Sequence, residues 1–279
     1  MSSPAMTTVN LWDTLCAELV SRREQASAAE HAEVARAFVD SAKSVLRADT
    51  PRLADAYEIA GDLCEAASID EQAAEHYRQA YDLSSRHHWF ISAGRAAAKW
   101  GFVLESLGKN DLAARSLQKA LTAFDDAGDH SQHVAILTRL AAIYRKSGEM
   151  PRSISAFERA IQISIRMHGR DHPEVADVMN NFAVAQTQVG DLDLAENLNL
   201  SALAIRESSF GPNHPEVAQS MGNLAVIYHL RGDTSRASNY YQGALEICKY
   251  CGDTGDNYLL IKKNFDRLKS DLNPTPYDQ

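Results

Sequence analysis

Two nearly identical stretches of sequence decide the fold of this chain. Residues 169–176 read Gly-Arg-Asp-His-Pro-Glu-Val-Ala, and residues 211–218 read Gly-Pro-Asn-His-Pro-Glu-Val-Ala. They lie 42 residues apart, and the same offset joins other pairs: Asn181-Phe-Ala and Asn223-Leu-Ala, Gly190-Asp and Gly232-Asp, Ala195 and Ala237, Ala202-Leu and Ala244-Leu. Self-similarity at one fixed period is the sequence signature of a repeat protein.

Weaker copies of the unit precede these two. A step of 42 residues back from Gly190 reaches Gly148, a step of 40 reaches Gly108, and a further 40 reaches Ser68. Each of these positions is followed by a stretch with the same order of small and large apolar residues. The unit therefore occurs at least five times, and the first copies are degenerate.

Each copy contains two apolar stretches with helical spacing. In the fourth copy they span about 175–189 and 192–208, and Gly190-Asp191 between them reads as a helix stop followed by an N-cap. Pro173 and Pro215 stand where a first helical turn tolerates proline. One helix pair of this length cannot bury its own apolar face, whereas stacked copies can. The expected fold class is all-α.

The copies alternate small and large residues at the predicted helix contacts. The small residues are Gly61, Gly101, Ala141, Ala183 and Ala225 in the first helices, and Ala73, Ala113, Ser153, Ala195 and Ala237 in the second helices. The large residues are Tyr77, Tyr144, Phe157, Tyr228 and Tyr241. The fourth copy departs from this pattern, since Gln186 replaces the usual aromatic residue of the first helix and Asn199 replaces that of the second helix. We expect weaker packing there.

This arrangement of small residues, aromatic residues and a turn glycine resembles the tetratricopeptide repeat. The 42-residue version is similar to the kinesin light chain subtype, whose second-helix pattern is carried by Ala202-Leu-Ala-Ile-Arg and Ala244-Leu-Glu-Ile. The close match covers about residues 132–251, and the looser pattern reaches back to about residue 52. The resemblance implies a right-handed α-α superhelical solenoid of tetratricopeptide-type helix pairs, with the first helices on its concave side.

The sequence also predicts how the chain is divided. We expect an N-terminal helix pair in residues 1–50, which is either a diverged repeat or a cap, and five repeats in residues 51–255. Residues 256–272 are expected to form a capping helix with a polar outer side, as solenoid ends require. Residues 273–279 read as a tail.

Aligning the copies by the turn glycine predicts one face of the first helices as a peptide-binding groove. The candidate binding residues are Arg95, Lys99, Phe102, Arg139, Lys146, Asn180, Asn181, Gln188 and Asn223. This face should be basic in the middle copies and rich in amides toward the C-terminus. Asn181 and Asn223 occupy positions at which kinesin light chains and their relatives place groove asparagines. The expected ligand is a peptide with acidic residues and an apolar anchor, and a simple solvated helix face is the alternative.

Composition excludes several other classes of protein. The net charge of −9 disfavours nonspecific nucleic-acid binding, which depends on lysine and arginine at phosphates. No apolar run approaches the roughly 18 residues of a membrane span, and the N-terminus lacks the pattern of a signal peptide. The four cysteines do not form a disulfide framework in a chain of this length. A cytoplasmic location is the expectation.

The sequence carries no motif for catalysis or for a cofactor. It lacks a phosphate-binding glycine loop, a His-Glu-x-x-His motif and a nucleophile elbow. Cys248 and Cys251 form one Cys-x-x-Cys pair, whereas a structural zinc site needs four ligands. His168, His172 and His214 recur with the connection between copies and are interpreted as capping residues. We therefore predict no enzyme, no cofactor and no metal site.

The leading hypothesis is a non-enzymatic scaffold that binds another protein or a peptide in its concave groove. One alternative is a regulatory sensor, in which a signalling peptide switches the activity of a partner protein and residues 9–47 form the effector helices. Another is assembly into a homo-oligomer through the convex face or the ends of the solenoid. Neither membrane insertion nor nucleic-acid binding is expected.

Overall fold

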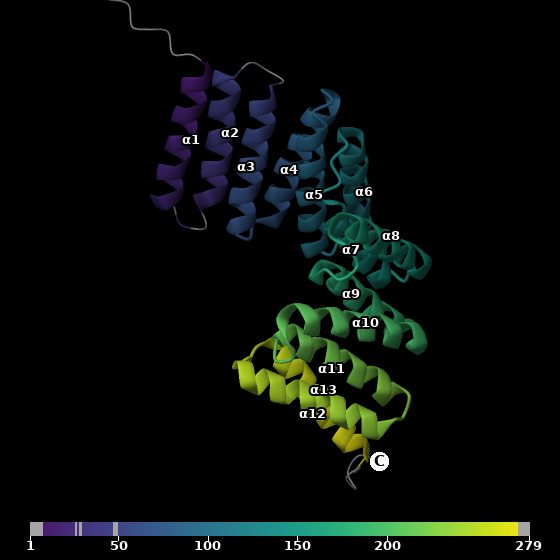
Figure 1. The fold of residues 1–279 in the computed structure, drawn as a ribbon. Helices are drawn as coiled ribbons and strands as arrows, with labels where there is room; N and C mark the ends of the chain where they lie inside the picture. The colour runs from purple at the N-terminus through teal and green to yellow at the C-terminus, as the bar shows by residue number, and fades with distance from the viewer. Residues whose placement is uncertain (1–7, 26, 28–29, 47–49, 273–279) are drawn as a thin grey trace, which may run out of the picture. The chain divides into compact units, whose positions relative to one another are not determined.

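The structure is a computed structural model that describes residues 8–25, 27, 30–46 and 50–272. These residues form thirteen α-helices and no strand, which confirms the all-α class (Figure 1). The predicted tail at 273–279 lies outside them. The helices are α1 (Thr8–Gln25), α2 (His31–Val45), α3 (Pro51–Ala66), α4 (Asp70–Arg86), α5 (Phe90–Ser106), α6 (Asn110–Ala127), α7 (His133–Lys146), α8 (Met150–His168), α9 (Pro173–Val189), α10 (Leu192–Phe210), α11 (Pro215–Leu230), α12 (Thr234–Cys251) and α13 (Asp256–Leu272).

The chain divides into two compact units. The first unit ends at Gly148 and the second begins at Glu149, so the division falls between α7 and α8, in the turn of the third copy. The first unit contains the first helices α3, α5 and α7, and the second contains α9 and α11. Each unit is described separately below.

The repeated His-Pro-Glu sequence starts the first helices of the second unit. Pro173 and Pro215 are the first residues of α9 and α11. Nδ1 of His172 accepts a hydrogen bond from the backbone N–H of Glu174 at 3.3 Å, and Nδ1 of His214 makes the same contact in the next copy. The histidines therefore cap helices, as predicted, because they satisfy N–H groups that the first helical turn leaves without a partner.

The turns within the repeats require a left-handed backbone. The turn glycines have positive φ angles: 71° at Gly108, 77° at Gly148, 85° at Gly190 and 77° at Gly232. Glycine adopts this conformation readily because it lacks a Cβ atom. The first copy has Ser68 at the corresponding position, with φ of 58°. The same turn is therefore built there at a steric cost.

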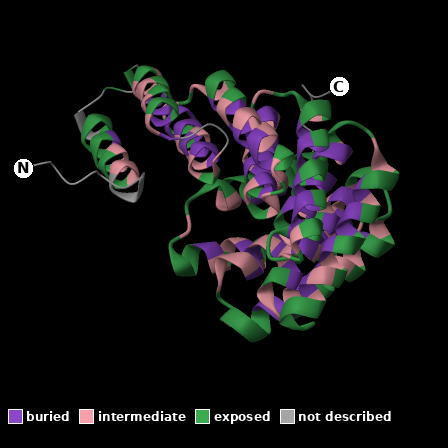
Figure 2. Cartoon of the chain, turned by 90° about the horizontal axis from the view of Figure 1, so that it is seen from above, coloured by how far each residue is buried: buried purple, intermediate pink, exposed green. Residues whose placement is uncertain are grey.

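The predicted small residues lie where helices touch. The second-helix positions Ala73, Ala113, Ser153, Ala195 and Ala237 are each 0% exposed. In the first copy, a Cβ atom on Gly61 would lie 2.5 Å from the ring of Tyr77, so the tyrosine packs directly on the α3 backbone. Figure 2 shows the result: along single helices, buried residues occupy one side and exposed residues the other.

The terminal helices pack onto the helices beside them. In the first unit, Trp12 of α1 and Phe38 of α2 have ring centroids 6.1 Å apart. In the second unit, α13 buries Phe265 among residues of α12. Its outer side is less polar than a cap was expected to be, because Leu259 and Leu260 are each 57% exposed. Among the described residues, no helix is long and apolar enough to span a membrane.

Candidate functional site

The predicted basic residues lie in the first unit, on α5 and α7, and they meet carboxylates of the preceding first helix. Arg95 Nε lies 2.9 Å from Glu58 Oε1, and Arg95 Nη2 lies 3.2 Å from Asp55 Oδ1. Lys99 Nζ lies 2.9 Å from Glu58 and 2.6 Å from Asp62. We call these five residues the α3–α5 cluster. Glu58 is its centre, with a side chain only 9% exposed.

The pKa values of this cluster reflect burial and ion pairing together. Burial lowers the pKa of Lys99, but hydrogen bonds to Asp62 and Glu58 outweigh that effect and hold the pKa above its usual value. Burial raises the pKa of Asp55 more than the Arg95 guanidinium lowers it. The basic groups are thus held in their charged form by the carboxylates around them.

A second cluster joins α5 to α7. Glu105 of α5 accepts hydrogen bonds from Arg139 Nε and from Lys146 Nζ, the latter at 2.7 Å. The Glu105 side chain is 9% exposed, whereas Arg139 is 52% and Lys146 is 50% exposed. The Arg139 guanidinium lies 5.5 Å from the centroid of the Phe102 ring, which is half-buried. We call Phe102, Glu105, Arg139 and Lys146 the α5–α7 cluster.

The two clusters differ in their balance of charge. The α3–α5 cluster contains three carboxylates and two basic groups, whereas the α5–α7 cluster contains one carboxylate and two basic groups. The sequence predicted a basic face across the middle copies. The structure instead offsets Arg95 and Lys99 with acidic side chains and leaves an excess of positive charge at Arg139 and Lys146.

The predicted amides lie in the second unit and divide into buried and exposed groups. Asn180 is 5% exposed, and its Oδ1 accepts a hydrogen bond from Asn223 Nδ2 at 2.8 Å. Asn181 and Gln188 lie on the exposed side of α9. The amide of Asn180 is therefore engaged within the protein, and the exposed members of the predicted set here are Asn181 and Gln188.

Sequence reasoning missed the residue that holds this part of the second unit together. Arg206 of α10 is 2% exposed and forms an ion pair with Asp177 Oδ1 of α9 at 2.7 Å. It also donates hydrogen bonds to the Glu216 carbonyl at 3.0 Å and to Ser220 Oγ at 2.9 Å, both on α11. Its only sequence signal is its place at the end of Ala202-Leu-Ala-Ile-Arg. That motif does not disclose the partners.

The two thiols of the Cys-x-x-Cys pair lie in different environments. Cys248 is 0% exposed, whereas Cys251 is exposed, and both are free thiols. Burial, reinforced by the Asp253 carboxylate, raises the pKa of Cys248 to about 11. A thiol with a raised pKa is a poor nucleophile at neutral pH, because the thiolate is the reactive form.

Comparison with known proteins supports the class that the repeats predicted. The tetratricopeptide repeat family matches residues 132–208 and 188–249. The chain is therefore similar to tetratricopeptide repeat proteins in the part that includes α7 to α12. Tetratricopeptide repeat protein 37 of Xenopus laevis is 25% identical over 144 residues, which are 51% of this chain. Those residues correspond to only 8% of that relative's length.

Solved structures of similar fold include BtubC (BKLC) from P. vanneervenii, with 22% identity and a TM-score of 0.65 over 86% of this chain and 93% of that chain. A putative kinesin light chain of Podosopora anserina has 15% identity and a TM-score of 0.61, over 74% of this chain and 99% of the other. YrrB, described as having an unusual peptide-binding site, has 20% identity and a TM-score of 0.53, over 82% and 99%. At these identities the likeness concerns the fold alone.

Proposed function

We propose that this protein is an interaction scaffold that binds a peptide segment of another protein at the α5–α7 cluster. The segment carries an acidic residue for Arg139 and Lys146 and an apolar side chain for Phe102. The observation that carries the proposal is Glu105, a nearly buried carboxylate that fixes two half-exposed cations. YrrB, with its peptide-binding site, has the same type of fold.

The fixed cations supply preorganisation. A free arginine or lysine loses side-chain entropy when it binds, and this cost subtracts from affinity. Here Glu105 already holds Arg139 and Lys146 by hydrogen bonds, and the Phe102 ring makes a cation–π contact with the Arg139 guanidinium. Both side chains stay about half exposed, so an incoming carboxylate meets two oriented basic groups.

The α3–α5 cluster is a weaker candidate for the acidic residue. Its three carboxylates would repel such a ligand, and Lys99 is only 31% exposed. In the second unit, we propose as a separate candidate contact that Asn181 and Gln188 donate to and accept from a peptide backbone, while Asn180 positions Asn223. Such amides bind a peptide backbone with little preference for its side chains.

The test is a peptide-display selection against the purified full chain, followed by affinity measurements on the selected peptides. The double substitution Arg139→Glu and Lys146→Glu should lower the affinity at least tenfold, because it replaces attraction by repulsion. The milder pair Arg139→Gln and Lys146→Gln should weaken binding in the same direction. Affinity should also fall with rising salt, since exposed charges are screened.

A matched control keeps the change in net charge and moves it to another surface. Lys109 and Arg115 are exposed in the first unit and lie at or on the second helix α6. Lys109→Glu with Arg115→Glu should leave the affinity within about twofold of the original. Equal losses in the test and control variants would mean that only net charge matters. Unchanged affinity in the test variants would contradict the proposed site.

A further inference from the structure

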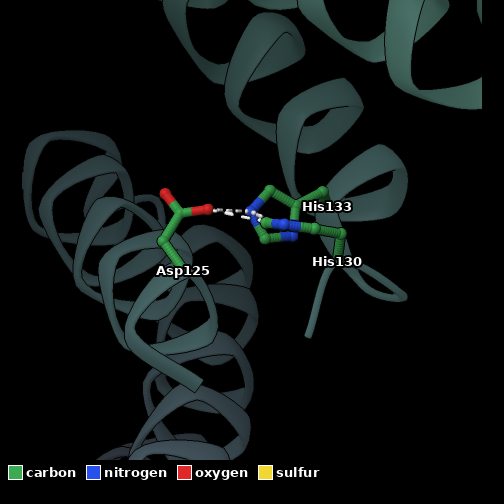
Figure 3. A group of neighbouring side chains, drawn as sticks. All are labelled: Asp125, His130 and His133. Atoms are coloured by element: carbon green, nitrogen blue, oxygen red, sulfur yellow. Dashed lines mark hydrogen bonds and ion pairs between the residues drawn. The ribbon is translucent and has the colours of Figure 1, made fainter. Parts of the chain in front are cut away.

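Three side chains outside the predicted face converge in the first unit, at the connection between α6 and α7. Asp125 lies in the last turn of α6, His130 lies in the loop, and His133 is the first residue of α7. Figure 3 shows both imidazole rings directed at the same carboxylate oxygen. Sequence reasoning missed this group because its spacing, Asp-x4-His-x2-His, crosses a helix end and matches neither a helical face nor a repeat.

The three donor atoms form a nearly regular triangle. Asp125 Oδ1 lies 2.8 Å from His133 Nε2 and 3.5 Å from His130 Nδ1, and the two nitrogens are 3.4 Å apart. Zinc bonds of about 2.0–2.1 Å at tetrahedral angles place neighbouring donor atoms about 3.3 Å apart. The triangle thus has the size of one face of a zinc coordination tetrahedron.

The backbone holds these residues in place independently of their side chains. Gly128 caps α6 in the left-handed conformation, with φ of 68°. The N–H of Asp129 donates to the Phe124 carbonyl at 3.0 Å, and the N–H of His133 donates to the His130 carbonyl at 3.1 Å. The donor set is therefore preorganised, which reduces the entropic cost of binding.

Burial leaves one side of the triangle open. His133 is 1% exposed, whereas the side chains of His130 and Asp125 are 56% and 49% exposed. An ion could enter from solvent and keep a water molecule in its fourth position. His133 uses Nε2 toward the triangle, and its Nδ1 has no hydrogen-bond partner among the described residues. Since metal-bound histidines are usually supported at the other nitrogen, we expect moderate affinity.

A second group of similar composition, in the second unit, provides a contrast. His168 Nε2 lies 2.9 Å from Glu174 Oε2, and the His168 and His172 rings stack with centroids 4.7 Å apart. His172 Nδ1 is already used as the cap of α9. In the next copy Phe210 replaces His168 and stacks on His214 at 4.5 Å. That arrangement persists without the first histidine, so it is explained by packing and capping.

We propose that Asp125, His130 and His133 bind a divalent transition-metal ion, with Zn²⁺ as the preferred occupant. Two imidazoles and one carboxylate suit Zn²⁺, and Co²⁺ and Ni²⁺ bind the same donor types. Binding requires His133 to present an unprotonated Nε2, because the ion takes the place of the Asp125–His133 hydrogen bond. The bound ion ties the end of α6 to the start of α7, which is the helix that carries Arg139.

The test uses the full chain without an affinity tag, freed of metal with a chelator. Zn²⁺ is titrated by calorimetry, and Co²⁺ is titrated by visible absorption, whose intense bands mark tetrahedral coordination. We expect one equivalent to bind at the triangle and to raise the melting temperature. His130→Ala and Asp125→Asn should each lower the affinity at least tenfold, and both positions are exposed enough to leave the fold intact. His133 is buried, so it is left unchanged.

The matched control is His168→Ala, which removes one member of the second group. It should keep the affinity and the cobalt spectrum of the original protein, and circular dichroism of every variant should show unchanged helix content. Absence of binding to the original protein would overturn the proposal. So would full binding by His130→Ala and Asp125→Asn. Loss of binding in His168→Ala alone would place the ion at the second group and would equally overturn it.

Discussion

Asn199 is fully buried on α10, and neither polar atom of its amide has a hydrogen-bond partner among the described residues. The corresponding positions in the neighbouring copies hold Phe157 and Tyr241. A buried polar group without a partner costs about 1–3 kcal/mol. Asn199→Leu keeps the number and branching of the side-chain heavy atoms and removes that cost, so we expect the free energy of unfolding to rise by about 1–2 kcal/mol. Denaturant unfolding at neutral pH measures the change.

The control for this prediction is Asn197→Leu, two residues earlier on the exposed side of the same helix. It makes the same chemical change without removing a buried amide. Its unfolding free energy should stay within about 0.5 kcal/mol of the original. An equal gain in both variants would point to helix propensity and would contradict the explanation by burial.

At the scale of residues, the repeats predicted the internal positions better than the surface contacts. Gln186 and Asn199 departed from the pattern visibly, and both prove to be buried. The partners of Arg139 and Lys146 could not be predicted. Glu105 lies 34 and 41 residues before them, and these separations match neither the repeat of 40 nor that of 42. Such pairs depend on side-chain conformation between helices, which periodicity does not encode.

The turn between α3 and α4 is an element in which sequence and conformation conflict. Ser68 has φ of 58°, where the later copies have glycine. The left-handed conformation costs a residue with a Cβ atom about 1–2 kcal/mol. Glycine avoids this cost, but it loses up to about 1 kcal/mol because its unfolded state has more conformational freedom. We therefore expect Ser68→Gly to raise the free energy of unfolding by about 0.5–1 kcal/mol. Thermal and denaturant unfolding should agree.

Ser147→Gly is the matched control, since Ser147 precedes a turn glycine and has φ of −85°. A glycine there gains nothing in the folded state and adds freedom to the unfolded chain. Stability should therefore stay equal or fall. If both serine substitutions changed stability by the same amount, the backbone conformation of Ser68 would not be the cause.

Helix boundaries followed from proline, glycine and the capping residues, with one informative difference. The second helix of the fourth copy was expected to end near residue 208, but α10 continues to Phe210. The Phe210 ring stacks on His214, which caps α11, and this contact supports the two additional residues. Both residues can be read from the sequence, but their contact depends on the path of the connecting loop, which the sequence does not show.

At the scale of the whole molecule, the helices contact their neighbours along the chain. Within each unit, contacts join each helix to the next one, or to the next but one as in α3 with α5 and α11 with α13. The sequence predicted this stacked organisation. It did not predict that the chain divides after Gly148, because the turn there carries the same glycine as the second, fourth and fifth copies. The division arises from how the helices pack, and the repeat pattern contains no signal for it.

Local contacts predict that damage to one repeat stays local, because the stability of a repeat protein is a sum of repeat and nearest-neighbour contributions. Gly61→Ala tests this idea in the first unit. The added Cβ atom would lie 2.5 Å from the Tyr77 ring, and overpacking of this kind costs about 1–3 kcal/mol. Hydrogen exchange should speed up at the amides of α3 and α4 and stay unchanged in α11 and α12.

The reciprocal experiment is Gly222→Ala in the second unit, where the added Cβ atom would lie 2.8 Å from Ile261 Cγ1. Protection should fall in α11 and α13 and should be retained in α3 and α4. The ring of Tyr77 is rigid, whereas the Ile261 side chain can rotate, so the Gly222 variant should lose less protection. Faster exchange throughout the chain after either substitution would mean that the molecule opens as one cooperative body, and the nearest-neighbour description would then be wrong.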